Sequence, residues 1–235
     1  MSAPLLLIET ATSRATVALA RADGTLIAGD AWQSPHRHGE ELLPRLDALL
    51  AAAGVGRRDI GGAAVGIGPG SFTGLRIGMA TAKTICQALR VPIVGLPTMP
   101  LLARAAAAAG ATGALAIVLP AGVGDRYLAR YEVTGDSVLE LQPPLLLPAG
   151  AVASAVLSGD MLVAVDLPAG EADAAAADLG QRAQSGLAGA LASAASEALA
   201  AGRSADVATL VPQYVALPRG VPASTEEMAW SPDLR

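Results

Sequence analysis

The chain of 235 residues is poor in aromatic side chains, in charges and in cysteine. Aromatic residues make up 3% of it, so the core must be built from alanine, leucine, valine and isoleucine. Hydrophobic residues make up 52% and charged residues 16%, which excludes a disordered chain. The single cysteine, Cys86, excludes an internal disulfide and is typical of a reducing compartment.

Basic residues are scarce as well, and the net charge is −5. The longest basic cluster is Arg57-Arg58, whereas a protein that holds nucleic acid by itself needs basic surface to displace counterions. If the protein acts on RNA, we expect a partner to hold the RNA. The N-terminus has no basic segment before its short apolar run, and the uncharged residues 105–124 contain Pro120. We therefore expect a soluble cytoplasmic protein without a membrane span.

The only two histidines are His36 and His38, and they precede Glu40 and Glu41. Imidazole and carboxylate groups can ligate a metal ion, but a spacing of two residues with no evident third ligand is a weak pattern. The pattern favours a solvated segment before a helix. It gives no support to a Ser-His-Asp triad, because a triad would have to be built from this segment alone.

Residues 64–89 predict a buried strand, a tight Gly68-Pro69-Gly70 turn and a long helix. Ser71 stands at the position of a helix N-cap, where its hydroxyl can accept a backbone N–H of the first turn. The glycines do not match a phosphate-binding loop, because the positions before Lys83 that require glycine hold alanine and isoleucine. The start of the helix could attract an anion, but a structural role is favoured.

The predicted helix carries two patterns. An apolar seam of the kind used in helix bundles recurs every three or four residues, at Phe72, Leu75, Met79, Ala82, Cys86 and Leu89. Gly74 and Gly78 lie four residues apart and predict a strip where the backbone of a neighbouring helix can come close. A glycine inside a helix costs about 0.5–1 kcal/mol relative to alanine, so these two glycines require a packing reason.

The order of the predicted elements indicates the fold class. A meander of three strands is followed by a helix over 40–53, the strand-turn-helix unit, and a strand over 91–96. This order is that of the ribonuclease H-like, actin-like (ASKHA) α/β fold, in which a mixed sheet is flanked by helices. The helix over 40–53 has a wide apolar stripe, which indicates either a core helix or one that also serves a partner.

The second half repeats this order in weaker form. We expect a second meander that ends at Pro143-Pro144, then a strand over 161–165 and an alanine-rich helical stretch over 172–201, broken near Gly180 and Gly186. An extended segment, residues 211–215, follows. The chain therefore divides into a first α/β subdomain (1–100), a smaller and more divergent second one (101–217) and a loosely held tail (218–235).

Three segments resemble the TsaB family, also called YeaZ, of bacterial tRNA threonylcarbamoyladenosine biosynthesis proteins. They are GIGPGSFTGLRIG at 66–78, LIETAT at 7–12 and HGEELLP at 38–44. The similarity covers the first subdomain, and VPQY at 211–214 also fits. The GPGSFTGLR core is specific to this family.

The resemblance implies a non-catalytic scaffold and activator in the complex that adds a threonylcarbamoyl group to the adenosine beside the anticodon of tRNAs reading codons that begin with A. It implies a TsaD-like catalytic paralogue and a TsaE-like ATPase as partners, with tRNA bound indirectly. TsaD carries a metal-binding HxxxH motif, which this chain lacks. The resemblance implies no metal and no resident cofactor, and leaves open a self-dimer and a nucleotide at a joint site with the partner.

The resemblance also assigns the site residues. The implied partner interface lies on two helices and comprises Leu42, Leu46, Leu49, Phe72, Leu75, Arg76, Met79 and Lys83. It is mounted on a signature turn formed by Gly68, Pro69, Gly70, Ser71, Gly74 and Gly78.

Other functions stay open from the residues alone. One is a stand-alone enzyme, either a glycoprotease-like metallopeptidase or an actin-like ATPase, and another is a self-dimer with a regulatory or proteolytic role. In actin-like phosphotransferases, an acidic residue at the end of the first strand, followed by glycine and threonine, holds magnesium and a phosphate. Here Glu9 is followed by Thr10-Ala11-Thr12, without the glycine that lets backbone approach phosphate.

Overall fold

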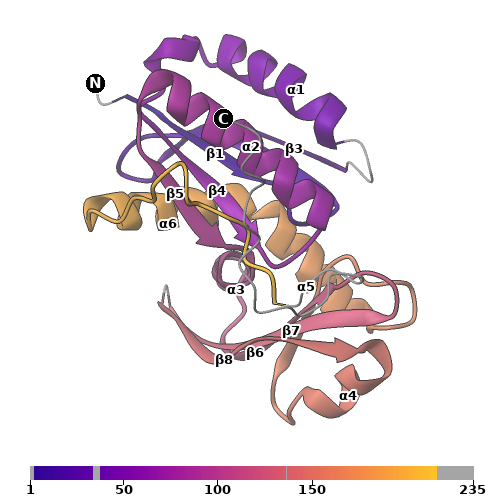
Figure 1. The fold of residues 1–235 in the computed structure, drawn as a ribbon. Coiled ribbons are helices and arrows are strands. Elements are labelled where there is room, and N and C mark those ends of the chain that lie inside the picture. Colours follow the sequence, from indigo (N-terminus) through magenta and orange to yellow (C-terminus); the bar gives the residue numbers. More distant parts are fainter. Residues whose placement is uncertain (1–2, 34–37, 136, 216–235) are drawn as a thin grey trace.

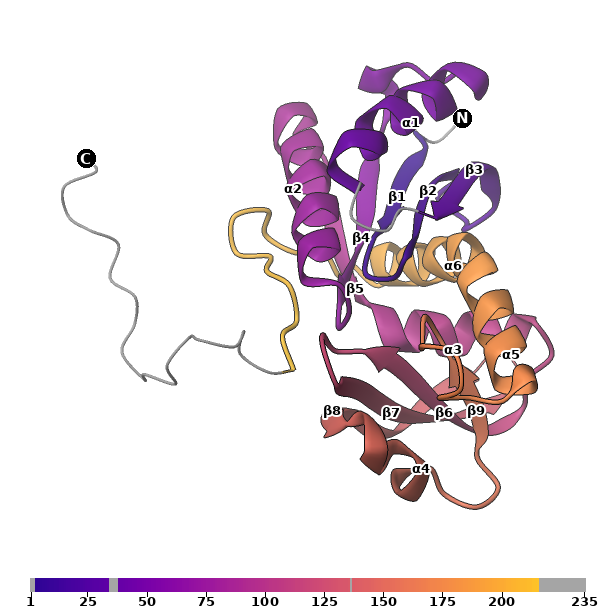
Figure 2. The same ribbon diagram turned by 90° about the vertical axis from the view of Figure 1, so that its right-hand side faces the viewer.

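The computed structural model describes residues 3–33, 38–135 and 137–215, which form two lobes (Figure 1). Each lobe is built on a mixed β-sheet, and helices lie between the two lobes (Figure 2). This arrangement confirms the predicted α/β class with two sheets flanked by helices. The predicted tail, residues 218–235, lies outside the described residues.

The first sheet has the strand order β3-β2-β1-β4-β5. Its strands are β1 (Leu5–Glu9), β2 (Arg14–Ala20), β3 (Leu26–Gln33), β4 (Gly62–Gly68) and β5 (Ile93–Pro97). The strand β1 pairs antiparallel with β2 and parallel with β4, as the predicted meander and αβ units require. Parallel neighbours need a crossover, which is supplied by α1 (His38–Ala52) with the short η1 (Arg57–Asp59) before β4, and by α2 (Phe72–Leu89) before β5.

The first sheet is buried on both faces because alternate side chains of its strands enter two different cores. Leu6 and Ile8 of β1 pack in the core beneath α1 and α2. Leu5 and Leu7 face the opposite core, which includes α6 (Leu187–Ala200). The continuous apolar run of β1 follows from this double burial.

The second sheet has the strand order β8-β7-β6-β9. Its strands are β6 (Gly113–Pro120), β7 (Asp125–Thr134), β8 (Ser137–Pro148) and β9 (Met161–Ala164). Two helices, α3 (Thr98–Ala108) and α5 (Ala174–Ser185), cover one face of this sheet. That face packs in the same core as the Leu5 and Leu7 side of the first sheet. The short η2 (Ala149–Ala151) and α4 (Val152–Ala155) cover a small cluster on the other face.

Helix α6 packs against the first sheet although it follows the second sheet in the chain. In Figure 2 it lies directly below the first sheet and above α3. One core therefore runs from Leu7 in the first lobe, through Leu191 of α6, to Ile117 in the second lobe. The sequence-based division places α6 with the second subdomain, whereas its contacts join it to the first.

Two expected boundaries were wrong. The strand β8 continues through Pro143-Pro144 to Pro148, because it lies at the edge of its sheet, where a residue without an N–H can be accommodated. Gly180 does not break the helical stretch but lies inside α5, where a methyl group would overlap the Ala164 carbonyl oxygen. The break occurs at Gly186 alone, between α5 and α6.

Candidate partner-binding face

The signature turn joins β4 to α2, and hydrogen bonds to Thr98 and to Ala11 hold it in place. Gly68 has φ +98°, a left-handed backbone conformation that favours glycine, and its N–H donates to the Thr98 hydroxyl at 3.2 Å. The Ser71 N–H donates to the Ala11 carbonyl at 2.7 Å. The Ser71 hydroxyl accepts the Gly74 N–H at 3.2 Å, which confirms the predicted N-cap of α2.

The two helix glycines do have a packing reason, but it differs from the expected one. A methyl group at Gly74 would overlap the Thr10 carbonyl oxygen, and one at Gly78 would overlap the Thr10 hydroxyl. That hydroxyl donates to the Gly74 carbonyl at 2.8 Å. The glycines therefore make room for Thr10, which follows β1 in the same chain. Another backbone does come close, as predicted, but it belongs to a loop and not to a neighbouring helix.

Glu9, at the end of β1, is fully buried. Its carboxylate accepts the Ala11 N–H at 2.7 Å and the Thr98 hydroxyl at 3.0 Å, and it lies so close to Gly66 that any side chain there would overlap it. Burial raises the Glu9 pKa to about 7, although the hydrogen bonds from Ala11 and Thr98 act in the opposite direction. A carboxyl held in this way serves as an internal anchor between β1, β4 and α3.

Five of the eight assigned interface residues are buried inside the chain itself. Leu42, Leu46, Leu49, Leu75 and Met79 are each less than a tenth exposed. The leucines of α1 belong to the core beneath the two helices, on the face that packs on the first sheet. In this structure these five side chains are buried beneath the helices and are not available on the surface of the described chain.

The outward faces of α1 and α2 lie side by side on the first lobe (Figures 1 and 2). On α1 the most exposed large apolar side chain is Leu43, at 54%. On α2 the exposed residues recur at helical spacing and comprise Phe72, Thr73, Arg76, Ala80, Thr84, Gln87 and Ala88. We call this set, together with Leu43, the outer face. It contains Phe72 and Arg76 from the sequence-based assignment.

The C-terminal segment, residues 206–215, runs beside α2 and forms one border of the outer face (Figure 2). Lys83 donates to the carbonyl oxygens of Ala208 and Leu210 at 3.3 and 2.9 Å. The Gln213 N–H donates to the Ile67 carbonyl at 2.7 Å. Lys83, assigned to the interface from the sequence, is therefore half-buried and engaged within its own chain.

Sequence reasoning missed two residues that complete this region. Tyr214 packs its ring 5.6 Å from that of Phe72, and Thr98 links Glu9 to the signature turn. The only sequence signal for Tyr214 was its place in VPQY at 211–214, one of the segments that fit the resemblance. No local pattern points to Thr98, which meets Glu9 across 89 positions of the chain.

The two lobes are also joined by polar contacts. The backbone N–H and the hydroxyl of Ser13, in the loop after β1, donate to the Asp166 carboxylate at 2.6 and 2.5 Å. Gln184 of α5 donates to the same carboxylate at 2.9 Å. Asp166 adopts φ +56°, a left-handed conformation that aspartate tolerates better than most residues. The loop that would face a phosphate in an actin-like phosphotransferase is thus tied to the second lobe.

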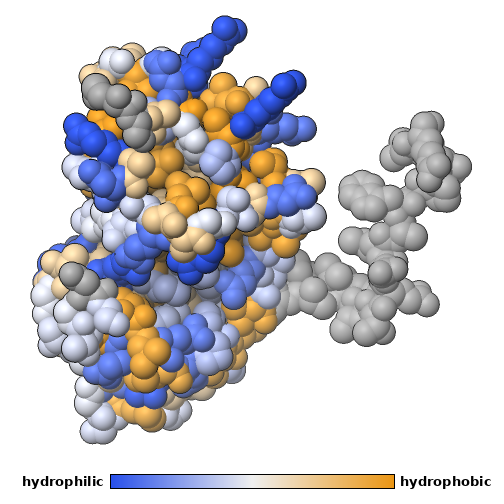
Figure 3. Space-filling model, turned by 90° about the vertical axis from the view of Figure 1, so that its left-hand side faces the viewer, coloured by the Kyte–Doolittle hydropathy of each residue, from blue (hydrophilic) through white to orange (hydrophobic). Residues whose placement is uncertain are grey.

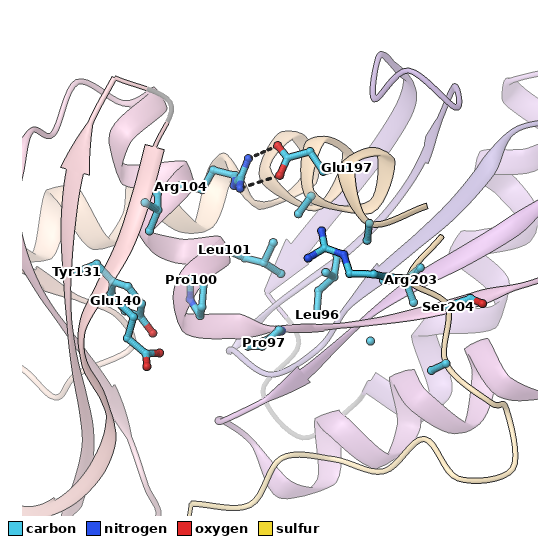
Figure 4. A pocket seen from close by; sticks show the side chains of 16 residues that line it. Leu96, Pro97, Pro100, Leu101, Arg104, Tyr131, Glu140, Glu197, Arg203 and Ser204 are labelled. Carbon is cyan, nitrogen blue, oxygen red and sulfur yellow. Dashed lines mark hydrogen bonds and ion pairs between the residues drawn. The ribbon is translucent and has the colours of Figure 1, made fainter. Parts of the chain in front are cut away.

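A cavity of about 560 Å³ lies between β5, α3, the β7–β8 pair and the end of α6 (Figure 4). Arg104 and Glu197 form a paired contact on its wall at 2.5 and 3.1 Å. The Tyr131 hydroxyl is buried without a partner among the described residues, and burial together with the charge of Glu140 raises its pKa. The lining contains two basic side chains, Arg104 and Arg203, and two acidic side chains, Glu140 and Glu197. The cavity therefore favours neither an anionic nor a cationic ligand. Figure 3 shows hydrophilic side chains along the junction of the lobes.

The histidine pair cannot be placed as a metal site. His36 lies outside the described residues, and of His38 only its place at the start of α1 is described. Within the described ranges, no group of three or more His, Cys, Asp or Glu side chains gathers as a metal site would. In the same part of the chain, no helix has the length and apolar character needed to cross a bilayer.

The fold and the site together define a class: a two-lobed, actin-like α/β protein with a buried carboxyl at the end of β1 and a long signature helix. The matching family model is described as TsaD: tRNA N6-adenosine threonylcarbamoyltransferase, and it matches residues 33–216. The chain belongs to this family.

Curated relatives and a solved structure agree with that assignment. The tRNA threonylcarbamoyladenosine biosynthesis protein TsaB of Escherichia coli is 37% identical over 129 residues, which cover 54% of each chain. The protein of that name from Haemophilus influenzae is 34% identical over 103 residues, which cover 43% of this chain and 42% of the relative. The chain thus spans about half the length of the curated relatives it matches. YeaZ from Pseudomonas aeruginosa superposes with a TM-score of 0.70 at 24% identity, over 91% of this chain and 100% of that one, and shares its fold.

Proposed function

We propose that this protein is a non-catalytic subunit in the biosynthesis of threonylcarbamoyladenosine in tRNA, where it binds and activates a TsaD-like catalytic subunit. The observation that carries the proposal is the outer face of α1 and α2 above the signature turn. This face is broad and exposed, and the residues beneath it, Leu42, Leu75 and Met79, are buried. A rigid, pre-organised helix face suits protein recognition better than catalysis.

Two further observations support an accessory role. Glu9, at the position where an actin-like phosphotransferase holds magnesium, is buried and anchored to backbone and Thr98. The net charge of −5 is unsuited to holding tRNA directly, so tRNA would be bound through the complex, with a TsaE-like ATPase as a further component in the cytoplasm. The relatives named TsaB support the pathway.

The substitution Ala80→Asp should disrupt the complex with the TsaD-like subunit. Ala80 is exposed in the middle of the outer face, so a charge there must be desolvated when a partner helix packs on α2. We expect the dissociation constant to rise at least about ten-fold, measured by calorimetry with the purified partner. The matched control is Ala175→Asp, which adds the same charge to an exposed alanine of α5 in the second lobe. Equal affinities for the two variants would remove the outer face as the interface.

Depleting the protein in its own host should lower the threonylcarbamoyladenosine content of tRNA. Nucleosides from digested tRNA are quantified by mass spectrometry, and the wild-type gene should restore the modification where the Ala80→Asp gene does not. Unchanged modification after depletion would contradict the proposed function. It would favour a separate role for the chain, such as a regulatory self-dimer.

A further inference from the structure

Two of the chain's six aromatic residues meet on the surface at the start of α2, although aromatic side chains usually enter the core. Phe72 and Tyr214 are each 39% exposed, with ring centroids 5.6 Å apart. The Arg76 guanidinium lies 3.8 Å from the centroid of the Phe72 ring, and its Nε donates to the Tyr214 hydroxyl at 3.4 Å. We call Phe72, Arg76 and Tyr214 the aromatic–arginine cluster.

The cluster is pre-organised, although its members lie 138 positions apart. Phe72 and Arg76 stand on the first turns of α2, directly after the capped signature turn. Tyr214 is held by the C-terminal segment, which is fixed to β4 through Gln213 and to α2 through Lys83. Ordering side chains at an interface is costly, so a cluster that is already stacked before binding favours affinity.

The composition of the cluster is that of an interface centre. Tyrosine, arginine and other aromatic residues are enriched among the residues that dominate binding energy, and they act from well-packed sites surrounded by weaker contacts. Here the surrounding contacts are available on the outer face, from Thr73 and Ala80. The sequence-based interface included Phe72 and Arg76 but not the ring that completes the cluster.

Resting on the proposed function, we propose that the aromatic–arginine cluster is the centre of the docking surface for the TsaD-like subunit. Tyr214 of the C-terminal segment is then as important for binding as Phe72 of α2. The matching site on the partner is an apolar hollow that receives the two rings, edged by acidic side chains that face Arg76.

Charge favours such a partner over a second copy of this chain. Helix α2 contains Arg76 and Lys83 and no acidic residue, and the C-terminal segment adds only Asp206, so these two segments around the cluster are positive. The acidic residues of the neighbouring helix, Glu40, Glu41 and Asp47, lie on α1. A two-fold contact centred on the cluster would place Arg76 of one copy against Arg76 of the other. Like charges that face each other across an interface are unfavourable, whereas an acidic rim is complementary.

The test measures binding between the full-length chain and its purified TsaD-like partner by calorimetry at two salt concentrations. We expect Tyr214→Ala to weaken binding at least about ten-fold, as loss of a central aromatic residue does, while Tyr214→Phe keeps the ring and stays near wild type. Arg76→Ala should make the affinity less sensitive to salt, since it removes the charge that pairs with the acidic rim. Leu139→Ala, at a side chain 63% exposed on β8 in the second lobe, is the matched control and should bind as wild type does.

Each of the other possible results contradicts either the role of the aromatic–arginine cluster or the proposed function. Wild-type affinity in Tyr214→Ala, with an unchanged melting temperature, would overturn the role of the cluster and leave the proposed function in place. Tighter binding in that variant would overturn it too, because the C-terminal segment would then cover the interface instead of forming it. If the wild-type chains do not associate at all, the proposed function itself fails, and this inference fails with it.

Discussion

Replacing Gly74 by alanine is expected to destabilise the protein by about 3 kcal/mol, at the upper end of what overpacking costs. The Cβ would overlap the Thr10 carbonyl oxygen, which is backbone and cannot turn away as a flexible side chain could. Thr10 is itself fixed, because its hydroxyl donates to the Gly74 carbonyl at 2.8 Å. Relief therefore requires α2 to move away from the first sheet. Thermal unfolding should show the melting temperature lowered by roughly 6–12 °C.

Gly189→Ala is the matched control for this substitution. Gly189 is an exposed glycine inside α6, and an added methyl group would meet nothing within 4 Å. Because alanine is the better helix former, this variant should gain about 0.5–1 kcal/mol. A Gly74→Ala protein as stable as the Gly189→Ala protein would show that α2 does not need its close approach to Thr10.

The second large effect is a dependence of stability on pH that Glu9 introduces. Burial raises the Glu9 pKa from 4.5 to about 7, so the folded state binds a proton that the unfolded state releases between these values. The contribution of Glu9 to stability is complete below pH 4.5, falls as pH rises towards 7, and is then lower by about 3 kcal/mol. Glu9→Gln mimics the protonated form, because its oxygen can accept from Ala11 and its amide can donate to Thr98.

Urea unfolding of wild type and Glu9→Gln should therefore diverge as pH rises from 5 to 8, with the variant the more stable of the two at pH 8. Glu171→Gln gives a contrast of opposite sign, because the hydrogen bond from Arg126 lowers the Glu171 pKa and its charged form stabilises the fold. That variant should lose stability at neutral pH and match wild type in acid. A constant difference between wild type and Glu9→Gln across the range would show that Glu9 is ionised throughout.

The first lobe could be predicted from the sequence because its signals are local. The apolar run of β1, the Gly68-Pro69-Gly70 turn and the Ser71 cap each specify their own stretch of backbone. The end of β8 could not be predicted in this way. Its two prolines indicate a break in any isolated strand, and only its place at the sheet edge makes them acceptable.

The candidate site was harder to predict for a physical reason. An apolar helix stripe has the same sequence pattern whether it packs on its own sheet or on another protein, so Leu46 and Met79 fit both interpretations. Their burial in the core distinguishes the two. Tyr214 meets Phe72 through a contact between residues far apart in the sequence, which neither periodicity nor spacing can reveal.

The position of α6 has a consequence for how the protein is made. The face of the first sheet that contains Leu5 and Leu7 is covered by a helix that the ribosome synthesises after the whole second lobe. Until residues 187–200 emerge, the nascent first lobe exposes an apolar sheet face, and such surfaces are prone to aggregate. The first lobe can thus be completed only after the second lobe and α6 have been synthesised.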